Sequence, residues 1–181
     1  AGIRTESIRS NPLPDLLHSL IPLTDLGISP SLGFILIEIF FWGFLILKAP
    51  KDIPYAAKVY GVFLIFRSLF ISLTILGAPS NRIDDMPLFR LLTGMYFTKD
   101  LFPSGHVGFT FLAFLIAKDK ILKYIMLLST ITMAFLVLLP HSHYSIDVLG
   151  ALFVAYGSVG FYNLIKNRIP YMIKIKNTIF K

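Results

Sequence analysis

The sequence predicts an all-α fold, a polytopic bundle of transmembrane helices formed by a single domain, residues 1–181. Of its 181 residues, 55% are hydrophobic and only 15% are charged, and the mean hydropathy is +0.73. A soluble domain of this size could not bury so much apolar surface, whereas a bilayer accommodates it. Because a chain in lipid must satisfy its own backbone hydrogen bonds, helices are the expected spanning structure.

Apolar stretches occur at lengths compatible with membrane-spanning helices, which need about 17–25 residues each. Five are present: Ser31–Leu47, Tyr55–Leu76, Leu101–Ala117, Ile121–Leu139 and Ile146–Ile165. The third is the weakest, because Pro103 and Gly105 lie near its start and leave a short apolar run behind them. We therefore expect five spans, preceded by segment 1–30 and followed by a basic tail, 166–181.

The basic residues are distributed unequally between the two sides of this topology. Most of the 17 lie on one side, which the positive-inside rule makes cytoplasmic. These are Lys48, Lys51, Lys58, Lys118, Lys120, Lys123, Lys166, Arg168, Lys174, Lys176 and Lys181. Segment 1–30 and the loops Ser80–Asp100 and Pro140–Ser145 then face the extracytoplasmic side, and the tail is expected along the anionic inner leaflet. The Lys- and Ile-rich composition favours a bacterial inner membrane.

Charge and cysteine content exclude several classes of function. The net charge of +7 comes from residues in short loops, a pattern of membrane topology rather than of a nucleic-acid-binding face, so no nucleic-acid partner is expected. Because the chain has no cysteine, disulfides, thiolate metal sites and cysteine nucleophiles are excluded.

Three of the four histidines lie at the extracytoplasmic ends of predicted spans. His106 lies near the start of the third span, and His141 and His143 precede the fifth. If a helix starts near Ser142, His143 and Asp147 are one turn apart and share a face. The carboxylate can then accept a hydrogen bond from one ring nitrogen and leave the other as a nucleophile.

Other polar residues supply what phosphoryl transfer needs. His106 can give or take a proton, and Ser104 with the Gly105 amide can bind a phosphate oxygen at a helix amino terminus. Arg67 lies within a predicted span, so we expect it to face the bundle interior and neutralise a phosphodiester. Glu38 either supports the histidines or pairs structurally, with Arg67 as one candidate partner. The pattern indicates a phosphohistidine intermediate, without a metal or another cofactor.

Two histidines, His141 and His18, are not assigned a catalytic role from the sequence. His141 either assists the nucleophile or caps its loop, and both interpretations stay open. His18 is interpreted as a polar residue tolerated at a membrane interface.

Four motifs, in order along the chain, resemble those of the sphingomyelin synthase family, within the type-2 phosphatidic acid phosphatase superfamily. They are Pro12-Leu13-Pro14-Asp15; Gly61 with Arg67 and Pro79; Asp100 with Ser104-Gly105-His106; and His141-Ser142-His143-Tyr144-Ser145-Ile146-Asp147-Val148. The fourth is the most specific, and the resemblance extends from Arg4 to Lys166.

The resemblance implies a catalytic triad of His106, His143 and Asp147. His143 would attack the donor phosphate, Asp147 would orient it, and His106 would protonate the departing alcohol and later deprotonate the acceptor. The residues expected to bind substrate are Arg67, Ser104, Gly105, Asp100, Asp15, His141, Tyr144 and Glu38. The implied partners are membrane lipids: phosphatidylcholine or a related donor, and ceramide, diacylglycerol or another lipid alcohol as acceptor. A homo-oligomer is left open.

Two departures from the family pattern bear on function. The family has six spans, and its first, which precedes the Pro-Leu-Pro-Asp motif, is not present in this sequence. Pro103-Ser104-Gly105-His106 is the form usual in the phosphatases, yet Val137 stands where their motif has an arginine. The transferase is therefore favoured, with a lipid phosphatase or phospholipase-C-like hydrolase as the alternative. Transport is disfavoured, because the polar residues gather at one face.

Overall fold

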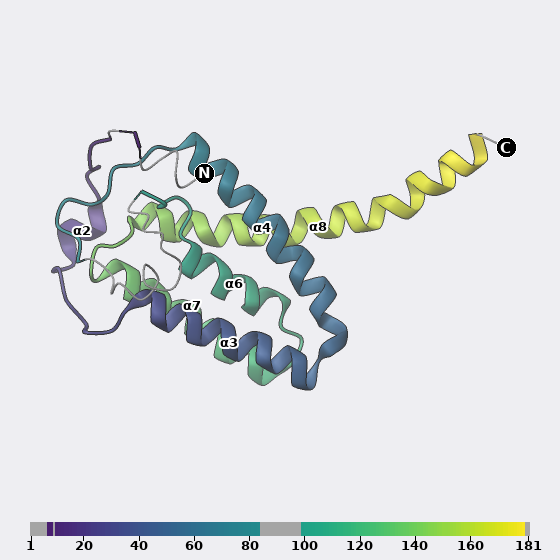
Figure 1. Ribbon diagram of the computed structural model, residues 1–181, viewed down its shortest axis with the longest axis horizontal. Helices are drawn as coiled ribbons and strands as arrows, with labels where there is room; N and C mark the ends of the chain where they lie inside the picture. The colour runs from purple at the N-terminus through teal and green to yellow at the C-terminus, as the bar shows by residue number, and fades with distance from the viewer. Residues whose placement is uncertain (1–6, 9, 84–98, 180–181) are drawn as a thin grey trace.

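The computed structural model describes residues 7–8, 10–83 and 99–179, and of residues 169–179 it describes the backbone only. Parts of the predicted segment 1–30 and loop Ser80–Asp100, namely residues 1–6, 9 and 84–98, lie outside the described residues. The elements are α2 (Leu16–Leu20), α3 (Pro30–Lys48), the 3-10 helix η1 (Pro50–Asp52), α4 (Ile53–Leu73), α6 (Gly105–Ile116), α7 (Lys120–Leu138) and α8 (Ser145–Ile179) (Figure 1). Within the described ranges the chain is helical throughout its regular structure.

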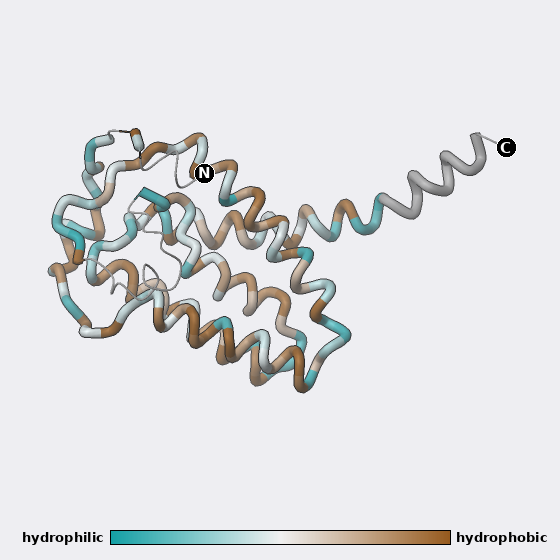
Figure 2. The backbone as a smooth tube through the Cα atoms, viewed as in Figure 1, coloured by the Kyte–Doolittle hydropathy of each residue, from teal (hydrophilic) through white to brown (hydrophobic). Residues whose placement is uncertain are grey.

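Four spans are long and apolar enough to cross a membrane: Pro30–Lys48, Pro50–Leu73, Lys120–Leu138 and Ser145–Arg168. This confirms the predicted helical membrane bundle. Their outward faces carry exposed apolar side chains, among them Leu47, Leu73, Ile121 and Phe153. Figure 2 shows apolar residues along the helices and hydrophilic residues at the connections between them.

The third predicted span, Leu101–Ala117, is shorter than expected. Its helix α6 covers only Gly105–Ile116, 12 residues, or about 18 Å, whereas a bilayer core is about 30 Å thick. Residues Leu101–Ser104 stay outside the helix, because a residue before proline avoids the helical conformation. The carbonyls of Asp100 and Pro103 accept hydrogen bonds from Arg67 instead. Two features therefore shorten this helix: Pro103, and the guanidinium of Arg67, which donates hydrogen bonds to the backbone carbonyls of the loop.

Side-chain caps fix where the long helices begin. Ser29 accepts a hydrogen bond from the Leu32 amide, and Pro30 occupies the first turn of α3. Asp119 accepts one from the Leu122 amide at the start of α7. Helix α8 continues without interruption from the predicted fifth span through the predicted tail to Ile179, and Figure 1 shows it extending beyond the bundle.

The short helix α6 lies at the centre and contacts α3, α4, α7 and α8. Its buried side chains join two apolar clusters. The first includes Phe41, Phe63, Leu112 and Met126, and the second includes Val107, Met133, Val137 and Ala151. Because every long helix packs on α6, its amino terminus is held at a fixed place among the ends of the others.

The bundle has two chemically different ends. At one end, the Lys118–Asp52 ion pair joins the turn between α6 and α7 to η1. At the other end, α3, α6 and α8 begin and α4 and α7 finish, and this end carries the histidines. We call it the histidine end.

Gly108 should be intolerant of a side chain, because a β carbon there would lie 2.2 Å from Cζ of the fully buried Phe63 ring. Gly108→Ala is expected to lower the free energy of unfolding by about 1–3 kcal/mol, through overpacking between α4 and α6. The measurement is thermal unfolding in detergent. Gly43→Ala is the matched control, because a β carbon at that helical glycine meets nothing within 4 Å. Equal losses in both variants would contradict the packing argument.

Candidate active site

A histidine and an aspartate form the buried centre of the histidine end. His143 Nδ1 lies 3.3 Å from Asp147 Oδ2, and the exposed fractions of the two side chains are 7% and 0%. In this arrangement the carboxylate fixes the tautomer with the proton on Nδ1, so the lone pair of Nε2 is available. This is the geometry of an oriented nucleophile.

The local backbone differs from the expected one but brings the same two residues together. Helix α8 begins at Ser145 rather than near Ser142, so His143 precedes the helix. Asp147, in the first turn, reaches back and accepts a hydrogen bond of 2.9 Å from the Tyr144 amide through the same Oδ2. This is the logic of a capping box, in which a side chain of the first turn satisfies an amide before the helix.

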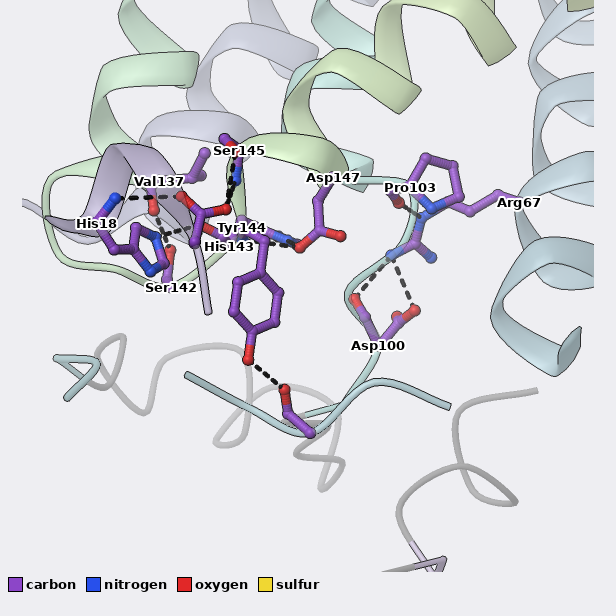
Figure 3. Close-up of polar contacts among 12 residues, drawn as sticks. His18, Arg67, Asp100, Pro103, Val137, Ser142, His143, Tyr144, Ser145 and Asp147 are labelled. Carbon is purple, nitrogen blue, oxygen red and sulfur yellow. Dashed lines mark hydrogen bonds and ion pairs between the residues drawn. The ribbon is translucent and has the colours of Figure 1, made fainter. Parts of the chain in front are cut away.

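Two carbonyls at the end of α7 hold the turn before His143, and Leu138 O accepts a hydrogen bond of 3.1 Å from the His141 amide. Val137 O accepts hydrogen bonds from the amides of Ser142 and His143 and from Ser142 Oγ (Figure 3). His141 adopts a left-handed conformation, with φ of 54°. We call residues His141–Ser145 the nucleophile loop.

His106 faces the nucleophile from the first turn of α6. The ring centroids of His106 and His143 are 5.8 Å apart, with the ring planes 69° from parallel. His106 Nε2 lies 3.4 Å from Ser31 Oγ on α3, and the His106 and Phe34 rings pack in a T-shaped arrangement with centroids 5.3 Å apart. A second imidazole at this separation can exchange a proton with a group bound between the two rings.

The amino terminus of α6 joins the site directly. The Ser104 amide donates a 3.0 Å hydrogen bond to the backbone carbonyl of Asp147, which ties the start of α6 to the start of α8. Ser104 Oγ is buried, and within the described residues it has no hydrogen-bond partner. The first amides of a helix lack intrahelical partners and favour an anion. A phosphate oxygen therefore fits here.

Arg67 from α4 lies against this amino terminus. Its Nε donates to Pro103 O at 3.1 Å, and its Nη2 pairs with Asp100 Oδ1 at 3.0 Å. A β carbon on Gly105 would lie 3.1–3.3 Å from the guanidinium, so a larger residue there would require Arg67 to shift by a few tenths of an ångström. Arg67 thus braces the loop before α6 and adds positive charge beside it.

The predicted residue Asp15 lies behind the nucleophile loop rather than among the catalytic groups. Its Oδ2 accepts hydrogen bonds of 2.8 Å from both the amide and Oγ of Ser145, and its Oδ1 accepts from the His18 amide. Partial burial raises the pKa of Asp15, but the hydrogen bonds from Ser145 outweigh it and hold the pKa below its ordinary value. Asp15 therefore caps α2 and anchors α8 at once.

Tyr144 ties two further segments to the same loop. Its hydroxyl donates to Gly77 O at 2.8 Å and accepts from the Leu13 amide at 3.0 Å. Gly77 in turn lies so close to Asn11 that a β carbon would meet backbone atoms at 2.4 Å. The amino-terminal segment and the connection after α4 are thus packed together over the nucleophile loop.

His18, interpreted from the sequence as a tolerated polar residue, makes specific contacts. Its Nε2 is bonded to the backbone carbonyl of His143 at 3.0 Å, and its ring stacks on His141 with centroids 4.0 Å apart. His141 Nε2 is bonded to Ile21 O at 3.2 Å. The two rings therefore join α2 to the nucleophile loop.

Glu38 lies apart from the histidines. Its carboxylate accepts hydrogen bonds from Trp42 Nε1 at 3.2 Å and from Tyr60 hydroxyl at 3.1 Å. It is seven residues beyond Ser31 on α3, about 10 Å along the axis. Arg67 pairs with Asp100 instead.

The predicted site residues thus fall into three groups. The first group meets around the starts of α6 and α8: His143, Asp147, His106, Ser104, Gly105 and Arg67, of which Figure 3 labels His143, Asp147 and Arg67. Asp15, His141, Tyr144 and Asp100 support those starts, and Glu38 is separate. Sequence reasoning missed His18, Ser31 and Ser145. The one available signal was that Asp15 and His18 lie three residues apart, as at a helix start.

Residues 99–164 match the family model described as PAP2 superfamily C-terminal. The matched range contains His106, His143 and Asp147. The match supports the type-2 phosphatidic acid phosphatase superfamily, and with it an enzyme acting on phosphate esters. Nothing matches among curated proteins or solved structures.

The His18 contacts predict an acid-sensitive fold. Burial lowers the pKa of His18 below its ordinary 6.5, aided by His141 and opposed by the His143 carbonyl and by Asp15 and Asp147. The unfolded chain then holds the proton more strongly, so stability is complete above the ordinary pKa and falls as pH drops through it. Between about pH 7.5 and about pH 5.5, the melting temperature should fall more for the wild type than for His18→Gln, which keeps a donor but does not titrate. Identical pH slopes would exclude His18 as the titrating group.

Proposed function

We propose that this chain is a phospholipid headgroup phosphotransferase of the kind its motifs resemble, sphingomyelin synthase. It would move phosphocholine or a similar phospho-headgroup from a glycerophospholipid to ceramide or another lipid alcohol. The observation that carries the proposal is the buried His143–Asp147 pair with the His106 ring 5.8 Å from that of His143. One oriented nucleophile and one opposed acid or base are the groups that a two-step displacement requires.

In the first step, His143 Nε2 attacks the donor phosphorus. The bond between phosphorus and the glycerol oxygen breaks, and His106 gives its proton to that departing oxygen. Diacylglycerol leaves, and the headgroup phosphate stays bonded to Nε2. Asp147 stabilises the positive charge that develops on the His143 ring.

In the second step, His106 takes the proton of the acceptor hydroxyl, whose oxygen attacks the phosphorus. The bond between phosphorus and Nε2 breaks, and the free imidazole is restored. In both steps the α6 amides, Ser104 Oγ and Arg67 are the groups placed to stabilise the phosphate oxygens. Arg67 uses Nε and Nη2 on the loop, which leaves Nη1 for the substrate in this proposal.

We place the site on the extracytoplasmic face of a multi-pass protein of a bacterial inner membrane. The support is the positive-inside rule: Lys48, Lys51, Lys118 and Lys120 lie at the end of the bundle opposite the histidines. Substrate would enter from the adjoining lipid leaflet.

A hydrolase is the second candidate, because Pro103-Ser104-Gly105-His106 has the form usual in phosphatases and the superfamily match is shared by both activities. The same residues would act in the same roles, and water would replace the lipid alcohol in the second step.

The first test identifies the acceptor. The purified chain in liposomes is given fluorescent ceramide or diacylglycerol with phosphatidylcholine or phosphatidylethanolamine, and the products are read by mass spectrometry. A new phospholipid carrying the donor headgroup is expected. Free phosphocholine or phosphate without a new lipid would replace the transferase by the hydrolase.

The second test examines the intermediate. His143→Ala should abolish turnover, while His106→Gln should lower it by about 10²–10⁴-fold, the usual contribution of a general acid or base. Phosphohistidine is acid-labile, so the wild type is digested under alkaline conditions and the peptide containing residue 143 is examined for an added phosphate. An active His143→Ala variant that is inserted and elutes as the wild type does would overturn the mechanism.

A further inference from the structure

Helix α2 has two faces of opposite character. Leu17 packs against the second apolar cluster, and His18 contacts the nucleophile loop. On the outer face, Leu16 is 72% exposed and Leu20 is 70% exposed, and residues four apart on a helix differ by about 40° in direction. The two leucines therefore project together, away from the protein.

The apolar surface continues along the chain on both sides of α2. The other exposed apolar side chains of this segment are Leu13, Leu23, Leu26 and Ile28. Six large apolar side chains exposed within 16 residues form a surface of the kind that marks an interaction site. We call residues Leu13–Ile28 the leucine segment.

The position of the leucine segment indicates what covers it. It ends at Ile28, and α3, a helix long enough to cross the membrane, begins two residues later at Pro30. A segment that feeds directly into a span lies at the boundary between the membrane and water. Its apolar side chains then meet acyl chains at the same depth as the first turn of α3.

We propose that α2 is an interfacial helix, whose partner is the lipid leaflet at the histidine end. Leu16 and Leu20 insert into the boundary between headgroups and acyl chains, and the remaining leucines of the segment lie in the same layer. The leaflet thereby holds α2 against the bundle.

This anchor bears on catalysis, a consequence that rests on the proposed function. Asp15 at the start of α2 binds Ser145 through two hydrogen bonds, and His18 binds the His143 carbonyl. The middle and the end of the nucleophile loop are thus joined to one five-residue helix and its capping residue. A short helix is unstable alone, so its position depends on what it packs against. Lipid on its outer face keeps the nucleophile in register with His106.

The depth of α2 can be measured without turnover. Because the chain has no cysteine, Leu16→Cys and Leu20→Cys each give a single site for a nitroxide label. In phosphatidylcholine liposomes, power-saturation EPR compares collisions with oxygen, which partitions into lipid, and with a water-soluble nickel complex. Ile39→Cys on the exposed face of α3 is the lipid reference, and Asn81→Cys in an exposed turn is the aqueous reference.

Labels at residues 16 and 20 should report oxygen collisions between those of residues 39 and 81, nickel collisions well below those of residue 81, and a depth of about 5–10 Å. Nickel collisions matching residue 81 would overturn the proposal. Spin–spin broadening that disappears on dilution with unlabelled protein would also overturn it, by showing a second copy of the chain on this surface.

Activity in the same liposomes tests the coupling. The double variant Leu16→Ser/Leu20→Ser should lose at least about threefold in kcat/KM, whereas Ile46→Ser/Leu47→Ser, two equally exposed residues at the opposite end, should not. Equal effects of the two double variants would overturn the coupling. If the wild type turns over no lipid, the proposed function fails, and the depth measurement still decides whether α2 is anchored.

Discussion

The histidine end of the bundle depends on the hydrogen bonds that Asp147 accepts. Its Oδ2 accepts from the His143 ring and from the Tyr144 amide, and its backbone carbonyl accepts from the Ser104 amide. One fully buried residue thus orients the His143 ring, ends the loop before α8 and fixes the start of α6. A buried carboxylate is costly unless it is hydrogen-bonded, so these contacts are needed for the fold as well as for chemistry. The other carboxylate oxygen, Asp147 Oδ1, is buried and has no hydrogen-bond partner within the described residues.

The supporting contacts come from sequence positions far from the loop they support. Asp15 and Ser145 are separated by 130 positions, and His18 and His143 by 125. Bringing such distant residues together costs chain entropy before the contact contributes stability, so each contact depends on the others being formed. The cluster of Asp15, His18, His141 and Tyr144 therefore behaves as one unit. Its members should show non-additive effects when two are removed together.

The sequence was sufficient for the features that depend on local pattern. Apolar length predicted five spans, of which four are helices long enough to cross a membrane, and the spacing of His143 and Asp147 predicted their contact. The contact survived an error in the helix start, because a turn and a helix both bring residues four apart close together. The sequence indicated the shortening of α6 only in part. It shows Pro103, but it does not show that Arg67 donates hydrogen bonds to the loop before α6.

What the sequence did not reveal are partners across the fold. Nothing near His18 indicates that its ring stacks on His141, and nothing near Ser31 indicates that it meets His106. Glu38 illustrates the converse case. A carboxylate in a span calls for a partner, and the general rule offered Arg67, yet packing of α3 against α4 supplied Tyr60 and Trp42. The residue type alone indicates that the Glu38 carboxylate needs a hydrogen-bonding partner, and the helix packing determines which side chain that partner is.

The difference between transfer and hydrolysis follows from what surrounds the triad rather than from the triad. Both reactions share the first step, and the fate of a phosphohistidine depends on whether a lipid alcohol or water reaches it first. Phe34 packs against His106 in a T-shaped arrangement, with ring centroids 5.3 Å apart, so an apolar group flanks that imidazole. In the proposed mechanism, apolar side chains beside the site would lower the local concentration of water and leave a lipid hydroxyl at an advantage. The choice between the two acceptors would then depend on α3 and the surrounding leaflet, because either chemistry could use the same proposed catalytic groups.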